Sequence, residues 1–352
     1  MPREATMRTP TGRRRLGFLG AVFMLTAVMA AAPTAFAENG DGSPDPQVSP
    51  PAQASPDAQV AAVSDAPIML AHHPIQQPHP VGAPDEEKAY NTGRLSLNFG
   101  ADWVSAYYFR GIVFQKAGGD NVQPYLELDL RLLEDTGPLS SLTLAGGVWN
   151  SFHSGGGTFT EPTDAKFWFE ANLYTRLSAT WLDVFTTSVS YTYYNSPNDS
   201  FKSKADIALN LALDDTKWLG AFALHPSVLF AFQTQDHFLP EAKRDGVFMG
   251  LSFAPGYTFF KGAAYPVTVS TPMTFGFSVR DYYTFQGQNQ TFGYFQGGPE
   301  LNIPLKFMPA SIGKWTFKAG MQVLDMNSNL RQANGRSDSV TTIGHVGFAM
   351  TY

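Results

Sequence analysis

The sequence predicts an all-β protein, a transmembrane antiparallel up-and-down β-barrel of about 12 strands that follows a disordered N-terminal linker. Three observations predict this fold. The first residues have the pattern of an export signal. From about residue 93 onward, apolar and polar side chains alternate in segments of about ten residues. The chain ends on an aromatic residue, Tyr352. The expected domains are a signal peptide (1–37), a linker (38–92) and the barrel (93–352).

Composition narrows the class of protein. The chain of 352 residues has no cysteine, which excludes a disulfide framework, cysteine metal sites and a cysteine nucleophile. It is 14% aromatic and only 15% charged, yet its mean hydropathy is −0.15. This combination is typical of strands with one apolar and one polar face. A net charge of −6 argues against nucleic acid as a partner.

The N-terminus has the three parts of a secretory signal peptide. A basic stretch, Arg13–Arg15, precedes the apolar run Leu16–Ala32, and Ala35-Phe36-Ala37 forms a cleavage site before Glu38. An uncleaved membrane anchor is the alternative, but the apolar run is short and is followed at once by Pro33. We expect cleavage of this signal and localisation to the outer membrane.

The expected linker contains a stretch, Asp41–Asp57, that is rich in Pro, Ser, Gln and Asp. Such a composition buries too little apolar surface to become ordered. His72, His73 and His79 follow among prolines. A metal site requires ligands in a fixed geometry, so we expect a solvated periplasmic tail here and predict no metal or other cofactor.

Strands are predicted wherever the alternation has a period of two. Leu126, Leu128 and Leu130 share one face, and Glu127 and Asp129 share the other. In a later segment, Phe167 and Phe169 are expected on the lipid face, and Trp168 and Glu170 on the lumen face. Twelve strands are expected to begin near Leu95, Val122, Leu142, Phe167, Phe185, Lys204, Val228, Val247, Met273, Phe292, Trp315 and Val340.

The connections alternate in length. Short turns are expected at residues 135–138, 179–180, 214–217, 261–264 and 308–311. Longer connections are expected at 151–166, 234–245 and 327–339, and Gly155–Gly157 make the first of these flexible enough to fold inward. Short periplasmic turns and longer outer loops, with both termini on the periplasmic side, are typical of an even-stranded outer-membrane barrel.

Aromatic residues gather at the predicted strand ends, where two interfacial girdles are expected. A soluble sandwich with ordinary core aromatics is the alternative. The outer girdle would comprise Tyr107, Tyr108, Tyr193, Tyr194, Tyr282 and Tyr283, and the inner girdle Trp181, Trp218, Tyr257, Trp315 and Tyr352.

The last strand carries a terminal aromatic with alternating apolar residues: Val346, Phe348, Met350 and Tyr352. This pattern is similar to the signal read by the outer-membrane assembly machinery. The predicted partners are therefore this machinery, outer-membrane lipids, and small hydrophilic solutes or ions.

The opening of the barrel region contains Ser105, Tyr107, Arg110 and Gly111, in a Ser-x-Tyr-x-x-Arg-Gly pattern, and Gly147-Val148-Trp149-Asn150 follows later. These segments resemble the TorF-type putative porin family. The resemblance covers the barrel but not the linker, and it implies a porin-type outer-membrane barrel. Because glycine permits positive φ and arginine can bond carboxylates or carbonyls, we expect a structural role for Arg110 rather than one in selectivity.

A charged side chain facing lipid costs about 2–4 kcal/mol at mid-membrane, so strand charges should face the lumen. Six acids and four bases indicate at most a slight cation preference. We expect a channel for passive diffusion of small hydrophilic solutes or ions; a non-conducting structural or adhesive barrel is the alternative. The candidate pore-lining residues are Asp102, Glu127, Asp129, Arg131, Glu170, Arg176, Asp206, Arg280, Glu300 and Lys318.

A lipid hydrolase is the third and least favoured hypothesis. His225 and Ser227 are two residues apart on the lumen face, but they lie near the periplasmic end, and Pro226 removes a ladder donor. His153 and Ser154 are adjacent and should point to opposite faces. We therefore predict no enzymatic activity and no catalytic residues.

Overall fold

The computed structural model describes residues 93–154, 167–239, 245–263 and 265–352. The predicted signal peptide, the linker with its three histidines, and Gly155–Gly157 lie outside the described residues. Within the described ranges, every helix is too short or too polar to cross a membrane.

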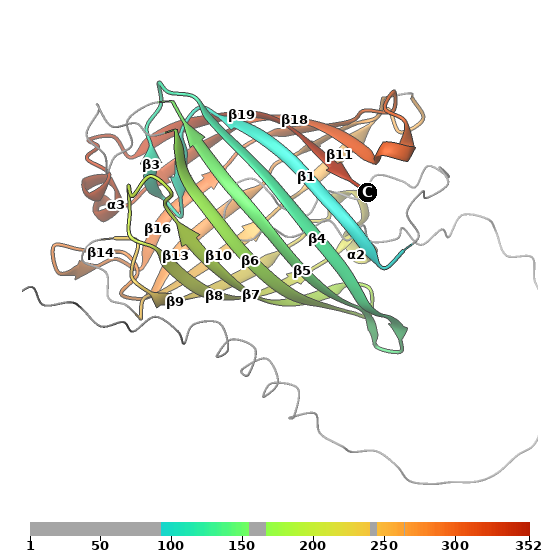
Figure 1. Ribbon diagram of the computed structural model, residues 1–352, viewed down its shortest axis with the longest axis horizontal. Helices are drawn as coiled ribbons and strands as arrows, with labels where there is room; N and C mark the ends of the chain where they lie inside the picture. Colours follow the sequence, from blue (N-terminus) through green and yellow to red (C-terminus); the bar gives the residue numbers. More distant parts are fainter. Residues whose placement is uncertain (1–92, 155–166, 240–244, 264) are drawn as a thin grey trace, which may run out of the picture. The chain divides into compact units, whose positions relative to one another are not determined.

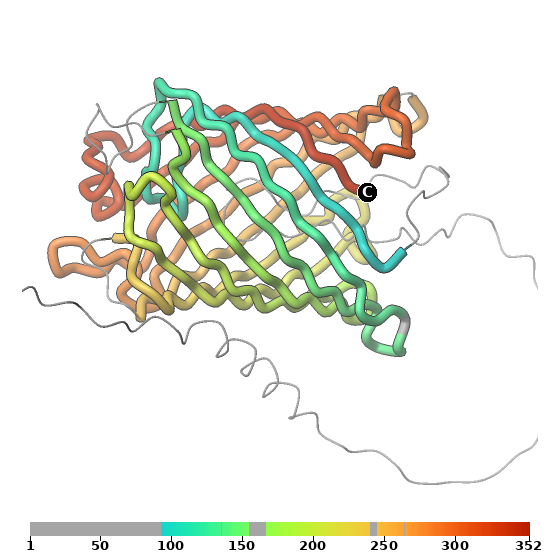
Figure 2. The backbone as a smooth tube through the Cα atoms, in the orientation of Figure 1, coloured from blue at the N-terminus to red at the C-terminus, as the bar shows by residue number. Residues whose placement is uncertain are grey.

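Twelve antiparallel strands form one closed barrel, as predicted (Figure 1). Neighbours along the chain are neighbours in the wall (Figure 2). Three of the strands are each interrupted once and therefore carry two labels. The strands are β1 Leu95–Val104, β4 Asn121–Thr136, β5 Leu139–His153, β6 Trp168–Trp181, β7 Phe185–Asn195, β8 Lys204–Leu213, β9 Ser227–Gln235, β10 Val247–Phe253 with β11 Gly256–Phe259, β12 Val267–Ser270 with β13 Met273–Arg280, β16 Phe292–Gly297 with β17 Glu300–Pro304, β18 Lys314–Met326 and β19 Val340–Thr351.

The barrel closes where the last strand meets the first. β19 pairs with β18 on one side and with β1 on the other, for example through Asp102 and Gly347. Leu97 and Tyr352 exchange two backbone hydrogen bonds of 2.8 Å at the end of this seam. The closed ladder leaves no sheet edge, which is what a bilayer demands of a β-structure.

The three interruptions have one cause. Pro255, Pro272 and Pro299 lie at the breaks of three successive strands, and proline cannot donate to a sheet ladder. The carbonyl oxygens still accept: the N–H of Thr271 donates to Pro255, at 2.8 Å, and the N–H of Met321 to Pro299, at 3.1 Å. Hydrogen bonds between neighbouring strands therefore continue at these breaks.

One predicted turn is displaced. Ala179 and Thr180 remain within β6, paired with Thr187 and Thr186 of β7. The chain reverses instead at residues 182–184, where Leu182 and Asp183 have φ of 53° and 60°. Aspartate adopts this left-handed backbone more readily than most residues, and the alternation alone did not reveal it.

The other connections carry short elements. On the inner side, α2 Thr216–Leu219 and the 3-10 helix Gly220–Phe222 join β8 to β9, and a second 3-10 helix, Ala310–Ile312, precedes β18. The outer connections contain the hairpin β2 Tyr107–Phe109 and β3 Ile112–Gln115, the hairpin β14 Thr284–Phe285 and β15 Gln288–Asn289, and α3 Ser328–Ala333. All three lie at the barrel end remote from the C-terminus (Figure 1).

The two barrel faces follow the predicted alternation. On β4, Leu126, Leu128 and Leu130 are exposed, while Glu127 and Asp129 are buried. The prediction was wrong at the start of β6, where Trp168 is exposed and Phe169 is buried. A register shift between Ser151 and Phe152 of the neighbouring β5 accompanies this exchange of faces, because one extra residue in a ladder reverses the alternation.

Candidate functional site: the lumen and its inserted hairpin

The first outer connection folds back into the barrel as the β2–β3 hairpin. Its seven strand residues, Tyr107–Phe109 and Ile112–Gln115, are at most 3% exposed. Arg110 and Gly111 form its two-residue turn, with φ of 50° and 81°. Two successive positive φ values match the type I′ turn that tight hairpins favour.

Aromatic rings pack the hairpin against several sides of the wall. Tyr107 lies 5.6 Å from Trp149 on β5, and Phe114 lies 5.8 Å from Phe169 on β6, measured between ring centroids. Phe109 lies 4.8 Å from Phe238, which follows β9. The same buried cluster continues through Tyr194, Ala208, Leu229, Ala231, Phe248, Tyr282, Tyr283, Tyr294, Leu324, Met326, Leu330 and Ile343. Members thus come from strands all around the lumen.

Arg110 anchors the tip of the hairpin. One guanidinium nitrogen lies 2.9 Å from Asp206 Oδ2, and another donates to Tyr282 Oη at 3.1 Å. The same group stacks over Phe248, 4.8 Å from the ring centroid. Burial lowers the pKa of Arg110, but Tyr282 and Asp206 together raise that pKa well above its ordinary value. Arg110 therefore remains charged inside the barrel.

Further polar contacts hold the hairpin strands. Tyr107 Oη donates to Glu170 Oε2 at 3.1 Å, and Asn172 donates to the other oxygen of Glu170 at 2.8 Å. Tyr283 Oη donates to the backbone carbonyl of Arg110 at 3.0 Å. The base of the hairpin is tied as well, because Ser105 Oγ accepts from the N–H of Gly344 at 2.9 Å.

The last outer connection covers the hairpin. Asn334, just after α3, donates to the carbonyl of Gly111 at 2.8 Å and accepts from the N–H of Val113 at 3.0 Å. Arg336 donates to Tyr108 Oη at 2.7 Å. The Ser-x-Tyr-x-x-Arg-Gly residues Ser105, Tyr107, Arg110 and Gly111 therefore all lie in the hairpin or at its base.

The predicted outer girdle was wrong for most of its members. Tyr107, Tyr108, Tyr194, Tyr282 and Tyr283 are at most 1% exposed and belong to the lumen. The outer connections turn inward, which buries rings that an outward-facing loop would leave at the interface. At the opposite end of the barrel, Trp181, Trp218, Tyr257 and Tyr352 are exposed and Trp315 is half-buried.

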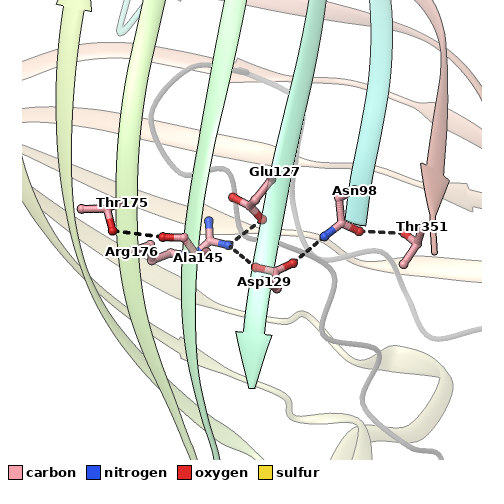
Figure 3. A network of polar contacts seen from close by, with 7 residues as sticks. All are labelled: Asn98, Glu127, Asp129, Ala145, Thr175, Arg176 and Thr351. Carbon is pink, nitrogen blue, oxygen red and sulfur yellow. Dashed lines mark hydrogen bonds and ion pairs between the residues drawn. The ribbon is translucent and has the colours of Figure 1, made fainter. Parts of the chain in front are cut away.

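A polar network crosses the seam of the barrel (Figure 3). Arg176 on β6 lies 2.9 Å from Glu127 and 3.8 Å from Asp129, both on β4. Asn98 on β1 donates to Asp129, and Thr351 on β19 donates to Asn98 at 2.9 Å. The network therefore links the interior sides of β6, β4, β1 and β19.

The remaining interior charges form two smaller groups. Lys318 Nζ lies 3.0 Å from Asp102. Glu300 accepts from Asn302 at 2.9 Å, and its other oxygen lies 3.3 Å from His345 Nε2.

The candidate pore-lining residues thus fall into two sets. Eight are buried in the barrel: Asp102, Glu127, Asp129, Glu170, Arg176, Asp206, Glu300 and Lys318. The other two lie near strand ends with exposed side chains. Arg131, 36% exposed, pairs with Glu134, and Arg280, 55% exposed, pairs with Asp245.

Sequence reasoning missed the buried amides of this interior. Gln123, Asn210 and Gln233 are at most 6% exposed, and within the described residues neither amide atom of any of them has a hydrogen-bond partner. Their position in the alternation was a usable signal. Gln123 pairs in register with Asp102, and Gln233 with Asp206, so each amide shares the interior face of a carboxylate.

A serine–histidine pair was also missed. Ser151 Oγ lies 2.8 Å from His153 Nε2 and donates to Asn121 at 3.0 Å. The signal is the spacing of two between Ser151 and His153 on β5, which puts both side chains on one face of the strand, unlike the adjacent Ser154. His153 stacks on Phe169, with ring centroids 4.2 Å apart, and both members of the pair are buried against the hairpin cluster. The packing gives a substrate no access to the hydroxyl.

His225 lies beside two aspartates at the end of the barrel opposite the hairpin. Its Nδ1 lies 3.5 Å from Asp214 and 3.9 Å from Asp215, on the inner side of the barrel. These three residues are close enough to suggest a metal site. However, Asp215 already accepts the backbone N–H groups of Leu224 and His225, so it caps the β8–β9 connection.

A closed antiparallel barrel with an apolar exterior and a polar interior defines a transmembrane barrel of the outer-membrane class. No family model matches the chain, and no curated protein matches it. Solved structures similar to it include the β domain of the Bordetella autotransporter Brka (9% identity, 74% of this chain and 99% of that one, TM-score 0.41). The NanC porin is 11% identical, over 72% of this chain and 98% of that one, with a TM-score of 0.35. Outer membrane phospholipase A from Escherichia coli is 10% identical, over 72% of this chain and 92% of that one, with a TM-score of 0.32.

Proposed function

We propose that the protein is a porin-like outer-membrane channel for small hydrophilic solutes or ions, and that the β2–β3 hairpin closes its lumen at the outer end. The observation that carries the channel is the charged and polar interior of the barrel, and the burial of the hairpin within its aromatic cluster supports the closure. Export by a cleaved signal peptide, contact with lipids and handling by the assembly machinery belong to the same proposal. So does membership of the TorF-type family, because its motif residues build and hold this hairpin.

The polar interior favours a channel over a plain membrane anchor. An anchor needs only an apolar exterior and can fill its interior with apolar side chains. Here the buried amides of Gln123, Asn210 and Gln233 have no hydrogen-bond partner among the described residues, and such groups are normally bonded to water. Water bonded to these amides would line a path along the interior face of the wall.

A non-conducting structural or adhesive barrel is the second candidate. The tightness of the aromatic packing favours it, since Val113 and Tyr283 are 0% exposed. In that case the function resides in the outer connections. The Ser151–His153 pair lends a lipid hydrolase no support, because it faces the interior rather than the lipid.

Planar-bilayer conductance separates the two candidates. The folded full chain is compared with a variant in which residues 107–115 are replaced by a short Gly-Ser linker. A second variant, Arg110→Ala, keeps the hairpin but removes its charged anchor at Asp206. Arg131→Ala is the control, because it breaks a solvent-exposed pair on the wall. Folding of each variant is checked by its heat-modifiable mobility in gels.

We expect the intact chain and Arg131→Ala to conduct little, the hairpin variant to conduct in stable discrete steps, and Arg110→Ala to open intermittently. Equal, large steps from the intact chain would show that the hairpin does not close the lumen. Silence from every folded variant would rule out the channel and leave the structural barrel.

A further inference from the structure

The interior of the barrel carries an excess of negative charge. Among the described residues that are buried, seven carboxylates (Asp102, Glu127, Asp129, Glu170, Asp206, Asp215 and Glu300) accompany four Lys or Arg side chains (Arg110, Arg176, Lys204 and Lys318). Asp215 caps backbone N–H groups at the inner connection. The excess persists without it.

The excess lies away from the hairpin. Near the hairpin, Arg110 pairs with Asp206, and the charge of Lys204 acts on Glu170. Elsewhere, four carboxylates face only two permanent cations. Lys318 neutralises Asp102, but Arg176 serves both Glu127 and Asp129. Glu300, which contacts Asn302 and His345, also interacts electrostatically with Lys318, so each of these two cations serves two acids.

Buried amides accompany these acids. Gln123 lies beside Asp102 on the interior face, and within the part of the chain that the structure describes neither of its amide atoms has a hydrogen-bond partner. Asn210, on β8, also has neither amide atom bonded within the described residues. Amide oxygens and carboxylates are ligands that replace the hydration shell of a hard cation, and rings of side-chain charge set selectivity in pores.

We propose that the lumen passes small cations in preference to anions, with Glu127, Asp129 and Glu300 supplying the negative potential. This inference rests on the proposed channel function and adds its substrate class. Arg176 acts against the selectivity, because it neutralises part of the charge of two acids. Removing an acid and removing Arg176 should therefore shift the selectivity in opposite directions.

The test is the reversal potential of single channels in a KCl gradient, measured on the full chain with residues 107–115 replaced by the linker and with Asp206→Asn, which removes the acid that the loss of Arg110 would leave unpaired. We expect the reversal potential to have the same sign as the equilibrium potential of K⁺. Glu127→Gln should move the reversal potential toward zero, and Arg176→Gln should move it further toward the K⁺ limit. Glu134→Gln and Arg131→Gln, an exposed acid and an exposed base that also pair with each other, are the matched controls and should leave it unchanged.

Three results would overturn the inference. A reversal potential near zero or of the sign set by Cl⁻ refutes cation preference while leaving the channel itself intact. Shifts of equal size in the controls would assign the effect to surface charge rather than to the lumen. Complete absence of conductance in folded protein removes the channel function, and the cation path with it.

Discussion

At the scale of single residues, the wall depends on glycines that lie beneath aromatic rings. A Cβ at Gly147 would lie 2.4 Å from Tyr174 Oη, and a Cβ at Gly276 would lie 2.2 Å from the ring of Tyr294. Each ring covers the backbone of a neighbouring strand where no side chain stands. The wide interior aromatics can therefore lie along the wall.

Gly147→Val should destabilise the folded barrel, because the new side chain displaces Tyr174 from its place on the wall. Overpacking of this kind costs about 1–3 kcal/mol. Gly146→Val is the control, since a Cβ there meets only a backbone oxygen, at 3.9 Å. Urea unfolding of both variants in lipid vesicles, followed by gel mobility, measures the difference. Equal unfolding midpoints would contradict this account of the glycine.

At the scale of elements, the two outer connections most distant in sequence support each other. The β2–β3 hairpin supplies the carbonyl of Gly111 and the N–H of Val113, and the α3 segment supplies the Asn334 amide that satisfies both. Leu330 of α3 is fully buried beside Gly111, where a Cβ would lie 2.7 Å from its methyl group. The hairpin is thus held from above as well as from the wall.

Asn334→Ala should loosen the hairpin, because two buried backbone groups lose their partner. An unsatisfied buried group costs about 1–3 kcal/mol. Hydrogen exchange at the Val113 amide should accelerate, while exchange in β4 stays slow. Gln332→Ala changes an exposed residue of the same helix and should have no effect. Unchanged protection of Val113 in Asn334→Ala would show that Asn334 does not hold the hairpin.

At the scale of the whole molecule, stability depends on which surface meets lipid. Leu128 is 48% exposed within β4, and Leu182 is 66% exposed in the inner β6–β7 turn. Only Leu128 lies within the apolar outer face of a strand, where exposed leucines alternate with buried polar residues. The same substitution should therefore have different costs at the two sites.

Leu128→Lys should cost about 2–4 kcal/mol of unfolding free energy in vesicles, as expected for a lysine near mid-membrane. Leu182→Lys should cost close to nothing, because its side chain reaches water. The comparison is made by urea titration of both variants in the same lipid. Similar costs at the two positions would place the membrane boundary elsewhere on the barrel.

The fold could be predicted because alternation is a local property. Leu126 and Leu128 are separated by a polar residue whatever the rest of the chain does, and a period of two assigns each to a sheet face. The same rule placed Glu127 and Asp129 in the interior. It misplaced Trp168 and Phe169, because a register shift beside β6 involves the partner strand as well as the strand itself.

The hairpin, in contrast, was decided by tertiary structure. Arg110 and Gly111 have a turn signature in the sequence. Whether this turn lies inside the lumen or outside the barrel depends on Asp206 and Asn334, which are far away in the chain. Apolar side chains such as Phe109 and Phe114 are equally suited to lipid and to a packed interior. Only the closure of the wall brings Trp149, Phe238 and Tyr283 together as the surface that buries the hairpin. Strand number and facing therefore follow from the order of residues along each strand, whereas the closed lumen follows from contacts that exist only once the barrel has formed.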